Sequence, residues 1–283
     1  MSQPQGLHFV TGEKGGIGKS LYCMVLLEYC LKNKLNYLFA DADRTSPDVG
    51  LIYEPETYGK SSTSSEQPEQ QNNYGEKLGS DDLTNGDELK PIYFSEDEED
   101  IFLADQLLEL ASNHLVIVNL PAQVSVMVDR WLQERSILNM ASEEQINITF
   151  WFVTDGSPES LNLLEQSLLK YKQQVDHIVV LNEGMNKRIR SSLTNHSVFK
   201  SLSLNNHALS TLVLPALSLS IAEKTLLKTQ RLPLGKASDR NFSSPLTLIA
   251  KQRIKQFLRQ SHQEISELGI FSDEKTSEAE EAS

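Results

Sequence analysis

A run of glycines and lysines near the start of the sequence has the composition of a phosphate-binding loop. Residues 12–20 read GEKGGIGKS and directly follow a short apolar stretch, Leu7 to Thr11. Glycines let backbone N–H groups turn toward a phosphate, and a helix that begins after such a loop adds its partial positive charge. Lys19 would then reach the β- and γ-phosphates of a nucleotide, and the Ser20 hydroxyl would bind Mg²⁺. The apolar stretch before the run and the helical pattern after it argue against a chance glycine turn.

The loop departs from the plain P-loop pattern in a specific way. A glycine is expected at position 13, where this chain has Glu13, and a lysine, Lys14, precedes GGIGKS. This arrangement resembles the deviant Walker A motif of the ParA/MinD family of ATPases. In that family the lysine reaches the nucleotide of the partner subunit in an ATP-bound sandwich dimer, so the resemblance implies that role for Lys14. The nucleotide-binding residues that it implies are Lys14, Gly15, Gly16, Ile17, Gly18, Lys19 and Ser20.

Two aspartates close the next apolar stretch, in the sequence YLFADAD. Their position is similar to the D-x-D of the same family. The resemblance implies that Asp41 supports the water shell of Mg²⁺ and that Asp43 orients the attacking water. An aspartate pair at a strand end is also a common turn device, so the phosphate loop is what favours the catalytic interpretation.

Two asparagines end later apolar stretches. Asn119 stands where the family has its Walker B aspartate, followed by Pro121 as the family pattern requires. A neutral amide can hydrogen-bond a metal-bound water but brings no charge, so we expect weaker Mg²⁺ binding and slow ATP hydrolysis. Asn182 ends HIVVLN, where the family commonly reads adenine with an asparagine. A cap at the strand end is an equal alternative for Asn182.

The elements that must position these residues alternate along the chain. Strands are predicted in the runs LHFVTG, NYLFAD, LVIVNL, ITFWFVTD, HIVVLN and TLVLPAL, and helices at residues 19–31, 99–111, 158–172 and 219–228. The runs are continuously apolar, as in strands that are covered on both faces. This pattern predicts an α/β fold with a mostly parallel, doubly wound sheet and a ligand at the carboxyl ends of its strands. By resemblance it is a P-loop fold of the ParA/MinD type.

Charge divides the chain into parts. The 283 residues carry a formal net charge of −13, and residues 54–109 alone hold sixteen acidic residues against three lysines. Residues 58–90 are rich in Ser, Gln, Asn and Glu and have few large apolar side chains. We therefore predict one nucleotide-binding domain over 1–262, with 58–90 as a disordered acidic insertion and 263–283 as a disordered acidic tail.

Residues 224–259 form a basic segment with nine Lys or Arg against one Asp. A helix is predicted here, capped by Ser244 and Pro245 and running to about Gln260. Its expected buried face holds Leu246, Ile249, Ala250, Ile254, Phe257 and Leu258, and its basic stripe holds Lys251, Lys255 and Arg259. The stripe is either a solvated face or a surface that binds DNA phosphates without sequence preference.

Several other functions are not supported by the sequence. Cys23 and Cys30 lie on one helical face and are interpreted as core residues, and the six histidines show no zinc-ligand spacing. The nucleophile motif G-x-S-x-G is absent from the sequence. Neither a membrane-length apolar run nor a signal-peptide pattern occurs, so a cytoplasmic protein without a membrane partner is expected.

The combination of GEKGGIGKS, DADRTSPDV and NLPAQ is similar to the MobD-like group of the ParA family, which acts in plasmid mobilisation. The resemblance implies an ATP-dependent homodimer with weak ATPase activity that positions a protein partner or cargo. Two alternatives remain. One is a nucleotide-binding scaffold of a DNA-transfer apparatus that does not hydrolyse ATP. The other is an ATP-dependent biosynthetic ligase on the same fold, against which Lys14 argues.

Overall fold

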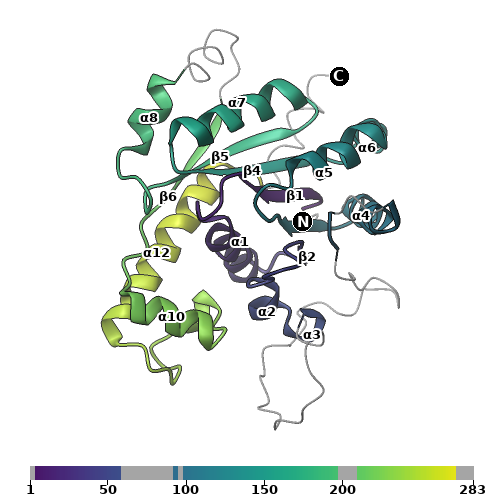
Figure 1. Cartoon of the computed structure of the whole chain (residues 1–283). Coiled ribbons are helices and arrows are strands. Elements are labelled where there is room, and N and C mark those ends of the chain that lie inside the picture. The colour runs from purple at the N-terminus through teal and green to yellow at the C-terminus, as the bar shows by residue number, and fades with distance from the viewer. Residues whose placement is uncertain (1–3, 59–91, 95–97, 197–208, 272–283) are drawn as a thin grey trace, which may run out of the picture.

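The computed structural model describes residues 4–58, 92–94, 98–196 and 209–271. Its centre is a six-stranded, all-parallel sheet in the order β2-β3-β1-β4-β5-β6 (Figure 1). The strands are β1 (Gly6–Thr11), β2 (Tyr37–Asp41), β3 (Leu115–Asn119), β4 (Ile148–Thr154), β5 (Asp176–Asn182) and β6 (Ser210–Leu214). All six predicted strands are present, and the predicted α/β fold is confirmed.

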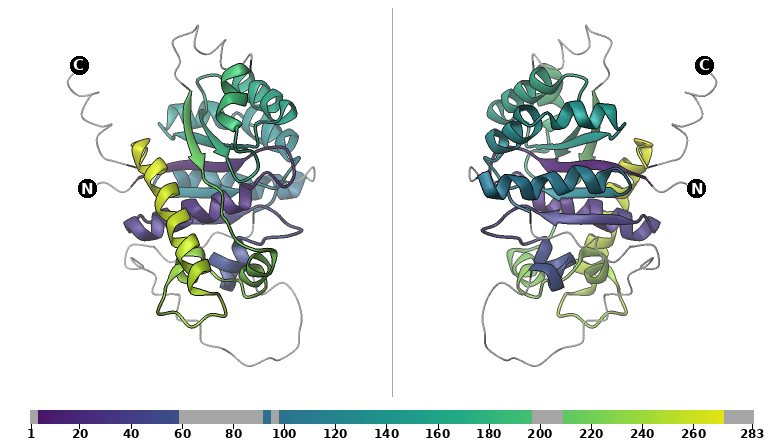
Figure 2. Two further views of the ribbon diagram at one scale, coloured as in Figure 1. Left: turned by 90° about the vertical axis from the view of Figure 1, so that its left-hand side faces the viewer. Right: turned by 90° about the vertical axis from the view of Figure 1, so that its right-hand side faces the viewer.

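Helices cover both faces of the sheet, as views from two opposite sides show (Figure 2). One face carries α1 (Lys19–Asn33), α10 (Ile221–Thr229), α11 (Leu234–Ser238) and α12 (Leu248–Glu267). The other carries α4 (Glu98–Ala111), α5 (Ser125–Asp129), η2 (Arg130–Glu134), α6 (Ile137–Glu143), α7 (Pro158–Tyr171) and α8 (Ile189–Asn195). Neighbouring strand residues serve opposite faces: Val10 packs in the α1 and α12 layer, and Phe9 in the α4 layer.

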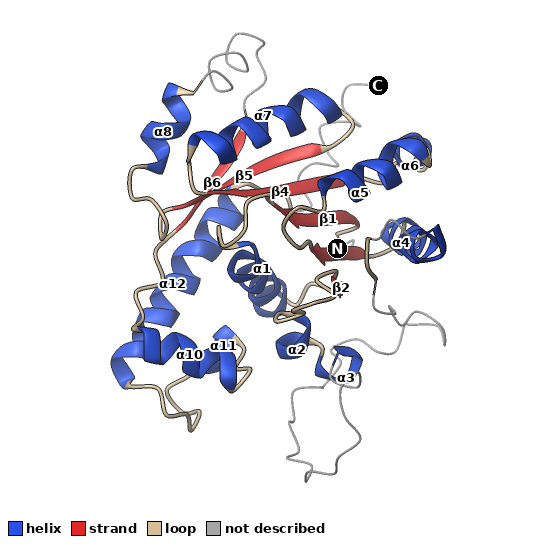
Figure 3. Cartoon of the chain, viewed as in Figure 1, coloured by secondary structure: helices blue, strands red, loops and turns tan. Residues whose placement is uncertain are grey.

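The four helices predicted between the strands are all present, each within two residues of its expected bounds (Figure 3). Two short helices, α2 (Gly50–Tyr53) and α3 (Pro55–Tyr58), follow β2 and were not predicted. Tyr58, placed by sequence in the acidic insertion, is a buried residue of α3. The remainder of that predicted insertion, up to residue 90, lies outside the described residues.

The C-terminal helix differs from its prediction at both ends and on both faces. It begins at Leu248, because the Thr247 side chain caps it by accepting the Ala250 N–H, and it ends at Glu267. The predicted domain boundary at 262 therefore falls inside a helix, and the predicted tail lies outside the described residues only after Phe271. Ile249, expected in the core, is 65% exposed.

Lys251, expected in the basic stripe, is buried and donates to the Phe242 carbonyl oxygen. No helix in the described ranges has both the length and the apolar character needed to cross a membrane.

The topology brings the carboxyl ends of all six strands to one edge. The chain leaves β1 toward β2 and β3 on one side, and β4 continues the sheet on the other side of β1. This reversal of strand order is the point where open α/β sheets form their ligand-binding crevice. The segment that follows β1 at that point is the predicted phosphate loop.

Candidate phosphate site

The loop between β1 and α1 has the backbone conformation of a phosphate cradle. Gly16 and Gly18 have φ of 73° and 100°, in the left-handed region that side-chain-bearing residues rarely adopt. A Cβ on Gly18 would lie 2.4 Å from Asn182 Nδ2, whereas a Cβ on Gly15 or Gly16 would meet no atom within 4 Å. The loop is therefore tightly packed at the base of α1 and open at its tip.

The Asn182 side chain binds the backbone of the phosphate loop. Its Nδ2 donates to the Ile17 carbonyl oxygen at 2.7 Å, and its Oδ1 accepts the Gly184 N–H at 3.0 Å. The side chain is buried at the end of β5. Both halves of the amide are thus engaged within the chain, as expected of the strand-end cap. Recognition of adenine by Asn182 stays a prediction, and it requires these bonds to be exchanged.

Lys19 is buried at the first position of α1. Its Nζ donates to the Lys14 carbonyl oxygen at 3.3 Å. Burial lowers the pKa of Lys19, and the charges of Glu13 and Asp43 oppose that shift, although neither acid forms an ion pair with Lys19 in the described ranges. Ser20, the next residue, is exposed at the open side of the loop. A buried cation beside an open loop suits a phosphate, because the anion would offset the lost hydration of the ammonium.

The Lys14 side chain forms its contacts within its own chain. Its Nζ lies 2.7 Å from Asp155 Oδ2 and 3.2 Å from Ser157 Oγ, at the amino end of α7. The hydrogen bond that Lys14 donates to Asp155 raises the pKa of Lys14. Burial pushes the pKa of Asp155 upward, yet hydrogen bonds from Lys14 and Ser157 outweigh it and hold that pKa below its ordinary value. Lys14 thus forms an ion pair across the edge of the sheet.

Asp41 is fully buried and accepts four hydrogen bonds. Oδ1 accepts from Asn119 Nδ2 at 3.0 Å and from the Asp43 N–H at 3.3 Å. Oδ2 accepts from the Val49 N–H at 3.1 Å and the Gly50 N–H at 2.8 Å. Burial raises the pKa of Asp41, against the effect of these bonds. Asp41 therefore fastens residues 42–50 to the sheet, and its predicted place in the Mg²⁺ water shell stays a prediction.

Asn119 leaves one acceptor available at this edge. It lies directly across from Asp41 in the β2 and β3 pairing, and its Nδ2 is used on that carboxylate. Its Oδ1 is buried and, among the described residues, has no hydrogen-bond partner. Buried polar atoms are nearly always satisfied, so this oxygen fits a bound water or the shell of a metal. The residues present are thus compatible with Mg²⁺ at the predicted position.

Asp43 lies at the outer side of the same edge. Its Oδ1 accepts from the Thr45 N–H at 3.1 Å, the Thr45 hydroxyl at 2.8 Å and the Ser46 N–H at 3.0 Å. These bonds make it a turn residue, and its effect on the pKa of Lys19 also places it near the phosphate loop. Within the described ranges no three His, Cys, Asp or Glu residues cluster as a metal site. Magnesium bound here would rely on nucleotide phosphates and water, as it commonly does.

Two site residues were missed by the sequence analysis. Asp155 and Ser157 follow β4 in TDGSP, and they meet Lys14 because the ends of β1 and β4 are neighbours. The signal was available: an acid at the end of a strand, followed by Ser-Pro at a helix start, belongs to the same edge of a parallel sheet.

Comparisons with solved structures give a distant likeness to a nucleotide-binding protein. No family model and no curated protein matches the chain. Among solved structures, it is similar to a nucleotide-binding protein from Archaeoglobus fulgidus in complex with ADP, with a TM-score of 0.42 and 14% identity. The match covers 81% of this chain and 88% of that one. At this distance the ligand of that protein cannot be transferred to this chain, so its function is inferred from its own residues.

Proposed function

We propose that the chain binds ATP with Mg²⁺ at the phosphate loop and acts as a nucleotide-operated switch. The observation that carries this proposal is the buried ammonium of Lys19, whose hydrogen-bond acceptor is a neutral carbonyl oxygen. A nucleotide phosphate would supply the missing anion. N–H groups of the loop and of the first turn of α1 would bind the phosphate oxygens.

Residues around the loop would hold the metal and the attacking water. Mg²⁺, when bound, neutralises part of the charge on the phosphates. Ser20 would contribute its hydroxyl, Asn119 Oδ1 would accept from a water of the metal shell, and Asp43 would orient the attacking water. Asn119 brings no negative charge, and Asp41 is already saturated by four donors. We therefore expect slow hydrolysis, which suits a switch better than a metabolic enzyme.

The switch that we infer is ATP-dependent dimerisation of the ParA/MinD type. In such a dimer Lys14 would reach the nucleotide of a second copy, so its pair with Asp155 must first break. The Lys14 side chain is 32% exposed in this pair, and partly exposed ion pairs contribute little free energy. Breaking the pair with Asp155 should therefore cost little free energy. A role in plasmid mobilisation or partition, with an unidentified protein cargo, rests on the MobD-like resemblance alone.

Calorimetry and light scattering test the two parts separately. Lys19→Ala should lose measurable ATP and ADP binding, while Lys32→Ala, an exposed lysine on the same helix, should bind normally. Lys14→Ala should bind nucleotide but stay monomeric with ATP and Mg²⁺, under conditions in which the wild type dimerises. Unchanged ATP affinity in a folded Lys19→Ala variant would refute nucleotide binding at the loop. Normal dimerisation of Lys14→Ala would refute only the dimer.

A second candidate is a nucleotide-binding scaffold that does not hydrolyse ATP. The observation in its favour is the neutral Asn119 bonded to a saturated Asp41, which leaves the site poor in negative charge for Mg²⁺. A single-turnover assay with excess protein separates the candidates. If the wild type releases phosphate, even slowly, and Lys19→Ala does not, the switch is favoured. If the wild type releases no phosphate over hours, the scaffold is favoured.

A further inference from the structure

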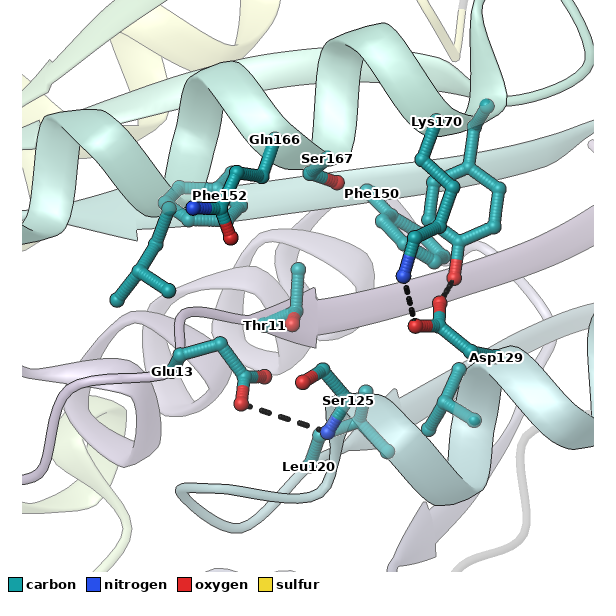
Figure 4. Close-up of a pocket in the computed structure, with 13 residues that line it drawn as sticks. Thr11, Glu13, Leu120, Ser125, Asp129, Phe150, Phe152, Gln166, Ser167 and Lys170 are labelled. Atoms are coloured by element: carbon teal, nitrogen blue, oxygen red, sulfur yellow. Dashed lines mark hydrogen bonds and ion pairs between the residues drawn. The ribbon is translucent and has the colours of Figure 1, made fainter.

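A hollow opens beside the phosphate loop, between α5 and α7 (Figure 4). Water-sized molecules can occupy about 70 Å³ of it, and it opens to solvent. Glu13 of the loop forms one end, and Asp129 and Lys170 form the other, as the labelled side chains show. Phe150 and Phe152 of β4 line its floor. This pocket is separate from the loop's open tip at Gly15 and Gly16.

The two acidic ends of the pocket differ in how they are neutralised. Asp129 accepts hydrogen bonds from Lys170 and from the Tyr171 hydroxyl, so its charge is paired. Glu13 is half-buried and accepts the Ser125 N–H at 3.4 Å. Among the described residues Glu13 forms no ion pair, although it acts by charge on Lys19. The pocket thus has one carboxylate that, in the described part of the chain, has no cation in direct contact.

The rest of the lining suits a long side chain with a charged end. Hydroxyls of Thr11 and Ser125 and, from α7, the amide of Gln166 also line the pocket and can accept N–H groups, while the floor is aromatic (Figure 4). Guanidinium groups combine several donors with a planar face that packs on aromatic rings. Each flanking helix also exposes one large apolar side chain, Val126 at 65% and Leu169 at 68%, which a partner bound at the pocket could contact.

We propose that this pocket binds an arginine side chain of a protein partner, with its guanidinium paired to Glu13. Glu13 acts on the pKa of Lys19, so the two ends of the loop interact electrostatically. A cation held at Glu13 would reduce the negative potential where the ATP phosphates bind. Binding of the arginine and of ATP should therefore strengthen each other by the same factor. Only this coupling rests on the proposed nucleotide function; occupancy of the pocket does not.

Calorimetry on the full chain without nucleotide tests the occupancy. The probe is butylguanidinium, and butylurea is its neutral control. Butylguanidinium should bind the wild type at least five times more tightly than butylurea does. Glu13→Gln should remove that preference. Gln166→Trp, an exposed position at the mouth, should weaken the probe at least fivefold by filling the pocket without changing charge. Glu144→Gln, an exposed acid outside the pocket, is the matched control and should bind as the wild type does.

The probe affinities of the wild type and the variants support or refute occupancy of the pocket. Equal affinity for the charged and neutral probes, or unchanged affinity in both Glu13→Gln and Gln166→Trp, would overturn the proposal. Loss in those two variants with retention in Glu144→Gln supports it. ATP titrations with and without the probe then measure the coupling, which should be absent in Glu13→Gln. If Lys19→Ala shows no ATP effect yet still binds the probe, the pocket stands independently of the nucleotide function.

Discussion

Two aspartates at the same edge of the sheet have opposite environments. Asp41, at the end of β2, is fully buried and accepts four hydrogen bonds from its own chain. Asp155, after β4, is partly exposed and pairs with one flexible lysine, Lys14. Removing Asp41 would strand buried donors, whereas Lys14 can be rehydrated or find another anion. The first aspartate is therefore part of the architecture, and the second makes a contact that a ligand can exchange.

The largest effect is expected from Asp41→Ala. Donors of Asn119, Val49 and Gly50 would lose their acceptor in a buried site, and each unsatisfied group costs about 1–3 kcal/mol. The free energy of unfolding, measured with urea, should fall by about 3–5 kcal/mol. Asp155→Ala is the matched control and should lose less than about 1 kcal/mol. Equal losses in the two variants would abolish the distinction between the two aspartates.

The next largest effect concerns Asn119→Asp, which places a second carboxylate against Asp41. When two buried carboxylates are in contact, the pKa of one of them is raised, because both cannot be ionised without repulsion. A raised pKa in the folded state means that stability is retained at low pH and lost as pH rises through that pKa. At pH 7 without metal we expect a loss of about 1–3 kcal/mol, which ATP with Mg²⁺ should largely restore while raising the hydrolysis rate.

Asn119→Ala is the control for this prediction. It removes the hydrogen bond to Asp41 without adding charge, so its loss of stability should change with pH less than that of Asn119→Asp. A variant Asn119→Asp with wild-type stability, the same Mg²⁺ requirement and the same rate would show that Asn119 lies outside the metal shell.

The same contrast between buried and exposed side chains of one type occurs on α12. Lys251 is buried on the Phe242 carbonyl, whereas Lys255 and Arg259 are exposed. We propose that the two exposed residues contribute to non-specific DNA binding, so their double alanine variant should reduce the salt slope by roughly 0.9 per phosphate contact. Lys251→Met should leave the slope unchanged and lower stability by about 1 kcal/mol. An unchanged slope in the double variant would show that the stripe is only solvated.

Sequence patterns predicted the fold well because continuous apolar strands and a glycine loop are local signals. All six strands and the strand, loop and helix around Lys19 follow from them. The patterns failed where contacts distant in sequence decide. The hydrogen bond between Asn119 and Asp41 spans 78 positions, and Lys251 is held by the carbonyl of Phe242, which lies in the loop before the helix rather than on a helical face. Neither partner can be read from spacing along the chain.

The smallest effect on stability, and the sharpest test of an exchangeable contact, is expected from Asp155→Asn. The variant keeps the shape of the side chain but removes its charge, so less than about 1 kcal/mol should be lost at pH 7. Because the folded pKa of Asp155 is lowered, its contribution is present above the unfolded pKa. It disappears as pH falls through the folded value, and the wild type and variant should then unfold alike.

If Lys14 must leave Asp155 to reach a second copy, Asp155→Asn should also dimerise at lower ATP concentration than the wild type. Light scattering across an ATP series measures this, with Glu159→Gln as the control. Glu159 acts on the pKa of Lys14 by charge but, among the described residues, forms no ion pair with it. Its variant should behave much like the wild type. If Asp155→Asn dimerises less readily than the wild type, the ion pair between Lys14 and Asp155 stabilises the dimer. Asp155 would then be a structural residue like Asp41, and the contrast between the two aspartates would have to be revised.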